Sequence, residues 1–483
     1  MNQPKTLLIN PPFSLEERYG KKLKHFGALT EPLGLAYLAA NLERYNYPVK
    51  ILDCPALNLS VKEIPQELKK EKYDLIGLTM LTPMYGNVKR TAQIIKKILP
   101  QTKIIAGGVH ATALPEETLK EIKSIDYICI GEGENTIVEL VQVLKGKKRI
   151  NQVDGLAYRE KDKIILTKPR RFEKNLDKFP PPARHLLPME KYKLTATRVK
   201  DTSFCPTLII ARGCPFNCSY CSHPFGRTFR HHSVKRVIQE IESLIKEYNI
   251  SELNMEADNL TVDRNFVISL CQEIIKRKLN KKIRWTCESR MDLVDKEMLT
   301  LMKKAGCWQI SYGVESGVQR LLNLINKGEK LEDMEEIFAL TKKVGITIRG
   351  FFMLGLPTET HKESLQTIKF AKKLNPLWAQ FTITTPYPGT PMFEMLKKAG
   401  EIKSLDWDRY NTWRGWTDKK APYIPKGRTL KELKFLQKKA STSFYLRPRA
   451  FFGFIKNLNS WATFKKYLIG FVTLLKIKLE EFF

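Results

Sequence analysis

The residues best suited to chemistry are three cysteines at the spacing C-x3-C-x2-C. Cys214, Cys218 and Cys221 lie in the octapeptide CPFNCSYC. Iron–sulfur clusters normally take four Cys ligands, so three ligands in one short segment would leave one iron open to a substrate or cofactor. Zinc is the alternative, because His223 follows two residues later and could complete a Cys3His site. A disulfide set is less expected, because nothing in the sequence indicates secretion.

A strand is expected to bring this segment into place. Residues 208–211 form an apolar run, and Arg212 and Gly213 interrupt it directly before Cys214. This pattern predicts a strand that leads into a loop. A loop can curl three thiolates around one inorganic cluster, whereas a helix or a strand would spread them apart.

Strand–helix units repeat through residues 201–400. Each predicted strand is followed by a polar or Gly/Pro-rich segment, at the end where β/α barrels carry their chemistry. Six units rather than eight predict a partial, open (β/α)6 barrel. The predicted strands are 207–211, 252–255, 284–287, 307–313, 347–353 and 380–385.

Residues 1–150 show the same alternation and predict a separate, doubly wound α/β domain with a parallel sheet. Glycine-rich turns at Gly107-Gly108 and Gly131-Glu132 fall at carboxyl ends of strands, where such sheets bind ligands. No G-x-G-x-x-G follows the first strand, which disfavours a dinucleotide fold. The predicted strands are 5–10, 49–53, 74–80, 103–108 and 127–131, and the predicted helices are 33–44, 88–98 and 136–144.

Over residues 1–450 the chain resembles radical S-adenosylmethionine (SAM) proteins with a cobalamin-binding domain. CPFNCSYC is similar to the radical SAM signature, and EADNLTVD, CESRMDLVD, YGVESG and GFFMLGLPTET are similar to later barrel segments of that family. GGVHAT and GEGEN resemble turns of the cobalamin-binding domain. The class includes the anaerobic Mg-protoporphyrin monomethyl ester cyclase, hopanoid-modifying enzymes and P-methylase-like enzymes.

The resemblance implies roles for residues of the barrel. Cys214, Cys218 and Cys221 would hold a [4Fe–4S] cluster, and SAM would bind the open iron. The segment after the second barrel strand begins Met255-Glu256-Ala257 rather than Gly-Gly-Glu, so the residue that binds the SAM amino group stays open. Each charged residue could instead form an ion pair at a strand end. The implied SAM contacts are Tyr220, near the adenine or methionine, Glu256 and Asp258, near the amino group, and Arg290 and Glu315, near the carboxylate and ribose.

The N-terminal resemblance implies cobalamin contacts. Many cobalamin domains carry D-x-H-x-x-G, whose His replaces the lower cobalt ligand, but this chain reads DCPALN from Asp53. We therefore expect cobalamin without a His lower ligand. The alternatives are a domain that has lost the cofactor and, for His110, a purely structural role. The implied contacts are Asp53, Thr79, Gly107, Gly108, His110, Gly131 and Glu132.

The implied function is radical chemistry on an unactivated carbon. SAM cleavage would give a 5′-deoxyadenosyl radical, and methylcobalamin would donate a methyl group to the activated carbon. A C-methyltransferase acting on a lipid-like or secondary-metabolite substrate is the first hypothesis, and a non-methylating cyclase or lipid-modifying enzyme is the second. A non-catalytic sensor is disfavoured by the complete Cys motif. We expect a flavodoxin or ferredoxin as electron donor and a cytoplasmic location.

The remaining segments contribute chain organisation and charge. Residues 151–200 predict a connector with a β-hairpin and a Pro-rich spacer. Residues 401–483 predict an aromatic cap, at 406–408 and 413–416, and then a helical tail with 15 Lys/Arg against 3 Asp/Glu from residue 419 onward. Its longest charge-free run, 467–475, is too short to span a bilayer, so we expect contact with the inner membrane surface or docking on the barrel.

The chain is strongly basic, with a formal net charge of +31. That charge indicates an anionic partner or simply a Lys-rich solvated surface. Nucleic acid is an unlikely partner, because no RNA-binding signature is visible.

Overall fold

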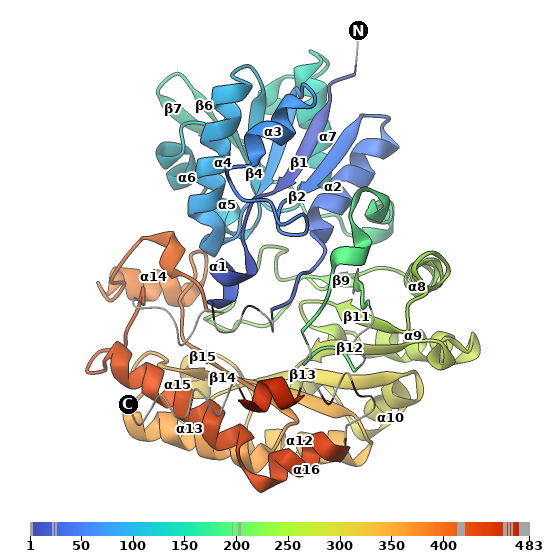
Figure 1. Cartoon of the computed structure of the whole chain (residues 1–483), viewed down its shortest axis with the longest axis vertical. Helices are drawn as coiled ribbons and strands as arrows, with labels where there is room; N and C mark the ends of the chain where they lie inside the picture. The colour runs from blue at the N-terminus through green and yellow to red at the C-terminus, as the bar shows by residue number, and fades with distance from the viewer. Residues whose placement is uncertain are drawn as a thin grey trace.

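The structure is a computed structural model that describes residues 3–21, 24, 27–195, 197–200, 204–412, 421–456, 461, 464 and 467–472. Two sheets organise the molecule, the N-terminal sheet at the top of Figure 1 and the barrel sheet below it. The predicted α/β fold, with a doubly wound domain before a partial barrel, is confirmed.

The N-terminal sheet has the strand order β2-β1-β3-β4-β5-β6-β7. Strands β1 to β5 pair in parallel, and β6 and β7 are antiparallel. The β6–β7 hairpin, which we predicted within the connector, pairs with β5 and therefore extends this sheet. The strands are β1 (Thr6–Asn10), β2 (Val49–Asp53), β3 (Leu75–Thr79), β4 (Lys103–Gly107), β5 (Tyr127–Cys129), β6 (Leu156–Glu160) and β7 (Lys163–Leu166).

Helices cover both faces of this sheet (Figure 1). Successive side chains of β1 point to opposite faces: Leu8 packs in one apolar cluster with Leu35 and Ile137, whereas Leu7 and Ile9 pack in another with α4. The chain thus buries both sides of its parallel strands, as the apolar runs predicted. The helices are α1 (Leu15–Tyr19), α2 (Leu33–Arg44), α3 (Ile64–Lys69), α4 (Tyr85–Ile98), α5 (Val109–Ala113), α6 (Pro115–Glu121) and α7 (Glu134–Leu144).

The barrel sheet is parallel throughout, with the order β15-β14-β13-β12-β11-β8. Neighbours in sequence are neighbours in space, and within the described chain the first and last strands do not pair, so the barrel is open. The strands are β8 (Thr207–Ile209), β11 (Glu252–Glu256), β12 (Arg284–Ser289), β13 (Cys307–Glu315), β14 (Thr347–Leu354) and β15 (Trp378–Ile383). The helices are α8 (Val234–Tyr248), α9 (Arg264–Lys276), α10 (Lys296–Lys304), α11 (Gln319–Leu324), α12 (Leu331–Lys343), α13 (His361–Leu374) and α14 (Pro391–Lys398).

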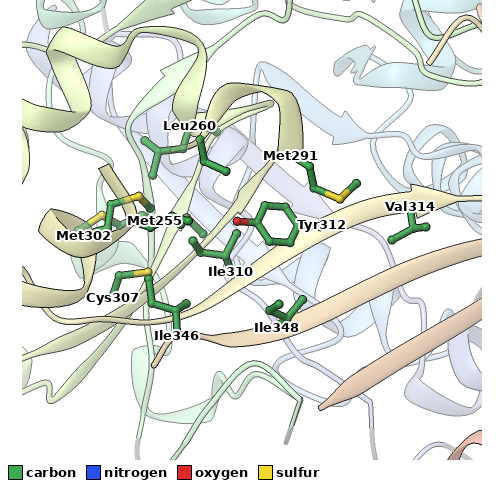
Figure 2. Close-up of a cluster of buried hydrophobic side chains, with 14 of the residues drawn as sticks. Met255, Leu260, Met291, Met302, Cys307, Ile310, Tyr312, Val314, Ile346 and Ile348 are labelled. Atoms are coloured by element: carbon green, nitrogen blue, oxygen red, sulfur yellow. The ribbon is translucent and has the colours of Figure 1, made fainter. Parts of the chain in front are cut away.

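Strand β13 shows how the barrel divides its side chains. Ile310, Tyr312 and Val314 are fully buried in the apolar core (Figure 2). Ser311, which alternates with them, points to the other face and so toward the barrel interior. The outer layer therefore provides the stability of the barrel, and the inner face is left for polar residues.

Polar caps fix where several helices of this region begin. A Ser, Asp or Thr side chain accepts a hydrogen bond from a backbone N–H of the first turn, which satisfies a donor that has no partner within the helix. The capping residues are Ser233 for α8, Asp263 for α9, Asp295 for α10, Thr360 for α13 and Thr390 for α14.

Two C-terminal helices, α15 (Leu430–Tyr445) and α16 (Pro448–Lys456), follow the barrel. Helix α15 packs against β15 and α13, and the Tyr445 hydroxyl donates to the Ala379 carbonyl at 2.8 Å. Residues 413–416 of the predicted cap, and all of the predicted tail after 456 except 461, 464 and 467–472, lie outside the described residues. None of the described helices combines the length and the apolar character needed to cross a membrane.

Candidate functional site

The three cysteines lie on a loop between two short antiparallel strands, β9 (Ala211–Arg212) and β10 (Arg230–His231). Ser219 attaches the loop to the barrel on two sides: its N–H donates to the Ile325 carbonyl at 2.9 Å, and its carbonyl accepts from the Met392 N–H at 2.8 Å. Cys218 is buried, Cys214 is half-buried and Cys221 is exposed. The prediction of a strand that leads into a cysteine loop is therefore met by the geometry.

Gly213 lets the chain turn into this loop. Its φ is +86°, and a Cβ at this position would lie 2.2 Å from the Thr228 carbonyl oxygen. The Gly213 N–H donates to Asp258 Oδ2 at 2.6 Å. Asp258 therefore holds the start of the cysteine loop.

The donor set suits an iron–sulfur cluster better than a single ion. Among the described residues, no three His, Cys, Asp or Glu side chains are already arranged around one metal position. In a cluster each Cys binds its own iron and no such convergence is needed. The Cys221 residue as a whole is exposed, but the surrounding loop crowds its thiol; this loss of hydration, and then the neighbouring Cys218 and Cys214, raise its pKa to about 12. A bound cation would relieve that cost of ionisation.

Arg290 lies directly beside the loop. Its Nη1 donates to Cys218 Sγ at 3.7 Å, and its guanidinium carbon lies 3.9 Å from the centroid of the Phe216 ring. The same side chain donates to the Lys327 carbonyl at 2.8 Å and to Asp292. Arg290 thus supplies positive charge next to the most buried of the three thiols.

Glu315 ends β13 in a left-handed conformation, with φ of +63°. Its Oε1 accepts from the Tyr220 hydroxyl at 3.0 Å and lies 3.8 Å from Lys327 Nζ. Gly313 makes room for this carboxylate, because a Cβ there would lie 2.3 Å from Glu315 Oε1. A non-Gly residue at positive φ is strained and is often found at functional sites.

Lys327 is a site residue that sequence reasoning missed, because Lys-Gly is an ordinary helix ending. It is buried and pairs with Glu315 and, at 3.2 Å, with Glu329. Burial lowers the pKa of Lys327, but the two carboxylates outweigh this effect and raise the pKa above its ordinary value. The structure therefore brings Tyr220, Arg290 and Glu315 together around a buried lysine.

Glu256 lies apart from this group, on the wall of a large cavity. It accepts from Asn254 Nδ2 at 2.8 Å and lies 3.8 Å from Arg198, which itself pairs with Glu288. The cavity has a volume of about 1610 Å³. Single ligand sites usually measure roughly 300–1,000 Å³, so this one has room for more than one molecule.

The cavity lies between the two sheets. Its N-terminal wall includes Asn10 and Thr79, at the ends of β1 and β3, and its barrel wall includes Glu256 and Glu315. Of the predicted cobalamin contacts, Thr79 thus lines the cavity directly. Asp53 is buried behind this wall and accepts from Asn10 Nδ2 at 2.8 Å and from Tyr192 at 2.7 Å. Its carboxylate therefore orients Asn10, which sequence reasoning missed.

The glycine turn and His110 do not line this cavity. Gly108 has φ of +116° and packs on the Met80 backbone, where a Cβ would lie 2.8 Å from the Met80 carbonyl oxygen; Gly107 ends β4 beside it. His110 is buried between Tyr85 and Trp407, with ring centroids 5.1 Å and 5.0 Å away. Burial lowers its pKa to about 4. This placement agrees with the alternative in which His110 has a purely structural role.

Gly131 and Glu132 do not line the cavity either: Gly131 lies beside Phe172 of the connector, and Glu132 faces the barrel domain. Glu132 is buried and accepts from Arg212 at 3.0 Å and from Arg230 at 3.0 and 3.1 Å, while Arg212 also donates to Glu134 at 2.7 Å. Arg212 and Arg230 lie at the two ends of the cysteine loop. We call these four side chains the interdomain ion network; it ties the first domain to the loop.

Comparison with known proteins identifies both domains. The B12 binding domain family matches residues 23–141, and the Radical SAM superfamily matches residues 208–371. An uncharacterized methyltransferase of Pyrococcus horikoshii is 36% identical, over 93% of this chain and 94% of that protein. The anaerobic magnesium-protoporphyrin IX monomethyl ester cyclase of Rubrivivax gelatinosus is 32% identical, over 79% of this chain and 68% of the cyclase.

Solved structures share the arrangement of both domains. The cobalamin-dependent SAM radical enzyme OxsB aligns with a TM-score of 0.75 and 18% identity, over 100% of this chain and 72% of that chain. The radical SAM methyltransferase TsrM from Kitasatospora setae aligns with a TM-score of 0.71 and 15% identity, over 100% of both chains. At these identities the likeness concerns the fold alone. The two family models and the two relatives above show that this chain belongs to the family of radical SAM enzymes that carry a B12-binding domain.

Proposed function

We propose that this enzyme transfers a methyl group to an unactivated carbon of a small, largely apolar molecule. The observation that carries the proposal is the shared cavity, which is lined both by strand ends of the B12-binding domain and by the barrel interior. When bound, the cluster and SAM supply radical chemistry and cobalamin supplies a methyl group. The 36% identical relative named as a methyltransferase supports this reaction class.

The chain's own residues have separate tasks in this proposal. Cys214, Cys218 and Cys221 hold the cluster, and the buried group around Lys327 binds the polar end of SAM. Asn10 and Thr79 contact cobalamin, with Asp53 orienting Asn10. The interdomain ion network keeps the two domains in register, so that the reacting groups meet inside the cavity, away from water.

The far wall of the cavity supports an apolar substrate. Phe351 and Met353 of β14 and Phe381 of β15 line it, together with Phe454 and Tyr467 from the C-terminal region. Aromatic side chains bury large apolar areas. A lipid-like molecule or a flat ring system would fit such a wall.

A cyclase that transfers no methyl group is the second candidate. The 32% identity to the Rubrivivax gelatinosus cyclase favours it. The two candidates differ in the fate of the SAM methyl group, which appears in the product only in the first.

We also propose that the C-terminal region contacts an anionic membrane surface. Phe452, Trp461 and Ile469 are exposed, at 68%, 68% and 54%. Exposed aromatic and aliphatic side chains within a basic segment are typical of interfacial helices. Sedimentation with anionic and neutral vesicles tests this contact; equal binding to both, or to neither, would contradict it. A flavodoxin or ferredoxin as electron donor belongs to the same proposal.

Anaerobic reconstitution with iron, sulfide and hydroxocobalamin tests the main proposal. We expect a [4Fe–4S] absorbance and EPR signal and about one cobalamin per chain; Cys218→Ala should lose the cluster but keep cobalamin. Methyl-labelled SAM should then transfer label in a metabolite extract. A cluster without cobalamin would reject methyl transfer through cobalt, and a modified product without label would favour the cyclase.

A further inference from the structure

Arg349 lies on the inner face of β14 and lines the large cavity together with Phe351 and Met353. Ile348 and Phe352, which alternate with these residues along β14, are buried in the apolar core. The strand period of two therefore places the Arg349 guanidinium in the part of the wall that Phe351 and Met353 make apolar.

This guanidinium is buried without a matching anion. Arg349 is 8% exposed, and its Nη2 donates to Gln380 Oε1 at 2.7 Å. Its Nη1 is buried and has no hydrogen-bond partner, and within the described part of the chain no carboxylate lies within salt-bridge distance of it. Burial, and then the charge of Arg198, lower its pKa to about 10, and Glu288, which lies beyond salt-bridge distance, offsets only part of this effect.

Such an arrangement is costly for the empty protein. A buried cation without a counter-ion loses its hydration and gains no ion pair in return. Other buried arginines of this chain have carboxylate partners, as Arg212 has in Glu132 and Glu134. A guanidinium presents a rigid fork that matches a carboxylate or phosphate with two hydrogen bonds. The missing partner is therefore expected to be an anion brought by a ligand.

The position of β14 in the barrel sheet would place this anion away from the edge that carries the cysteine loop. The cysteine loop follows β8 at one edge of the barrel sheet, whereas β14 is next to the opposite edge, with β11, β12 and β13 between them. Around Arg349 the cavity wall is made by Trp378 and Phe381 of β15 and by Tyr445 of α15. An anion there would carry an apolar body packed against these rings.

We propose that Arg349 binds a carboxylate or phosphate of the substrate, which makes the substrate class an acidic molecule with an apolar body. This inference rests on the proposed function, since it assigns the β14–β15 side of the cavity to the substrate. Gln437 adds a second polar contact: it lines the same wall, and its buried Oε1 has no donor. That oxygen can accept a hydrogen bond from a hydroxyl or amide group of the same ligand.

Two fluorescent probes that differ in one group test the inference. 1-Pyrenebutyrate has a carboxylate on an aromatic body, and 1-pyrenebutanol has a neutral hydroxyl instead. Binding is measured on the reconstituted full-length enzyme with SAM and cobalamin present. We expect the wild type to prefer the carboxylate probe, and Arg349→Gln to weaken that probe at least tenfold while the alcohol stays within twofold. Arg349→Lys, which keeps the charge but not the fork, should lie between.

A surface variant and two further measurements serve as controls. Arg320→Gln removes the same charge from a residue that pairs with Glu363 outside the cavity, and both probes should bind it as they bind the wild type. Arg349→Gln should keep SAM affinity and cobalamin content, and its melting temperature should stay unchanged or rise, because an unpaired buried charge is removed.

The outcomes separate this inference from the proposed function. No preference for the carboxylate in the wild type, equal weakening of both probes in Arg349→Gln, or loss of SAM or cobalamin from that variant would overturn the role of Arg349. Absence of methyl transfer in the wild type, with the charge preference intact, would reject the proposed reaction and leave the acidic-ligand site standing.

Discussion

Replacing Glu132 by Gln should uncouple the two domains. The carboxylate is buried and compensates two buried guanidinium groups, Arg212 and Arg230, at 3.0 Å each. Burial lowers the pKa of Arg212, but Glu134 and Glu132 outweigh this effect and raise it. In the variant the guanidinium stays charged, because the ordinary pKa of Arg is about 12 or higher and Glu134 is still beside it. Gln keeps the shape and some hydrogen bonds but leaves one carboxylate, Glu134, for two cations.

The expected loss follows from that imbalance. Removing one partner of a buried ion pair typically costs about 3–5 kcal/mol, and the hydrogen bonds kept by Gln place Glu132→Gln near the lower end. At roughly 2–4 °C per kcal/mol for a domain of this size, the first calorimetric transition should fall by roughly 6–12 °C. We also expect cleavage by a protease between the two domains to become faster.

Glu139→Gln is the matched control. Glu139 lies on α7, which begins two residues after Glu132, and it pairs with Arg170 and Lys148. Its side chain is 23% exposed, and these pairs do not reach the barrel. Glu139→Gln should lower the free energy of unfolding by no more than about 1 kcal/mol and leave the rate of proteolysis unchanged. Equal effects of the two substitutions on melting and on proteolysis would refute the coupling role of the network.

Three further outcomes are expected. Lowering the pH from 6.5 to 4 should destabilise the fold by up to about 3 kcal/mol through His110. Burial lowers the pKa of His110 to about 4, so only the unfolded chain binds the proton in that range. Urea unfolding of the wild type and of His110→Phe at several pH values measures this loss. Gly213→Ala should at least halve the iron bound on reconstitution, because its Cβ would lie 2.2 Å from the Thr228 carbonyl oxygen. Lys327→Met should destabilise the barrel by about 3 kcal/mol and weaken SAM binding measured by calorimetry, since two buried carboxylates lose their shared cation.

Each expectation can fail separately. An acid-induced loss of the same size in His110→Phe would assign the pH dependence to other groups. Full iron content in Gly213→Ala would mean that the loop can shift without harm. A Lys327→Met variant with wild-type SAM affinity would leave the lysine a purely structural role.

The bounds of a strand could be predicted from the sequence where strand-breaking residues such as proline stand at both of its ends. The strand at 49–53 has the same bounds in the structure, because it follows Pro48 and ends before Cys54-Pro55. The order of the barrel strands was also predictable, since successive parallel β/α units place neighbours side by side. The cysteine loop was readable because its chemistry depends on spacing within eight residues.

Partners distant in sequence could not be predicted. Glu132 was interpreted as part of a ligand turn because it sits between two glycines, but its partners Arg212 and Arg230 lie about 80 and 98 residues later. Arg349 was hidden for a different reason: nothing local distinguishes an arginine that points into a cavity from one that points to solvent. Only the strand register and the residues on the opposite wall of the cavity distinguish Arg349 from a surface arginine.

The composition of the cavity wall has a consequence for biosynthesis. The apolar core of the barrel draws on residues 208–444, and the N-terminal cluster beside α4 includes Phe393, Trp407 and Tyr410 from after the barrel strands. The cavity also takes wall residues from as early as Asn10 and as late as Phe471. A nascent chain therefore lacks a closed reaction chamber and part of its N-terminal core until the segments after β15 emerge and dock. Chemistry inside the shared cavity can therefore begin only after residues up to Phe471 have left the ribosome.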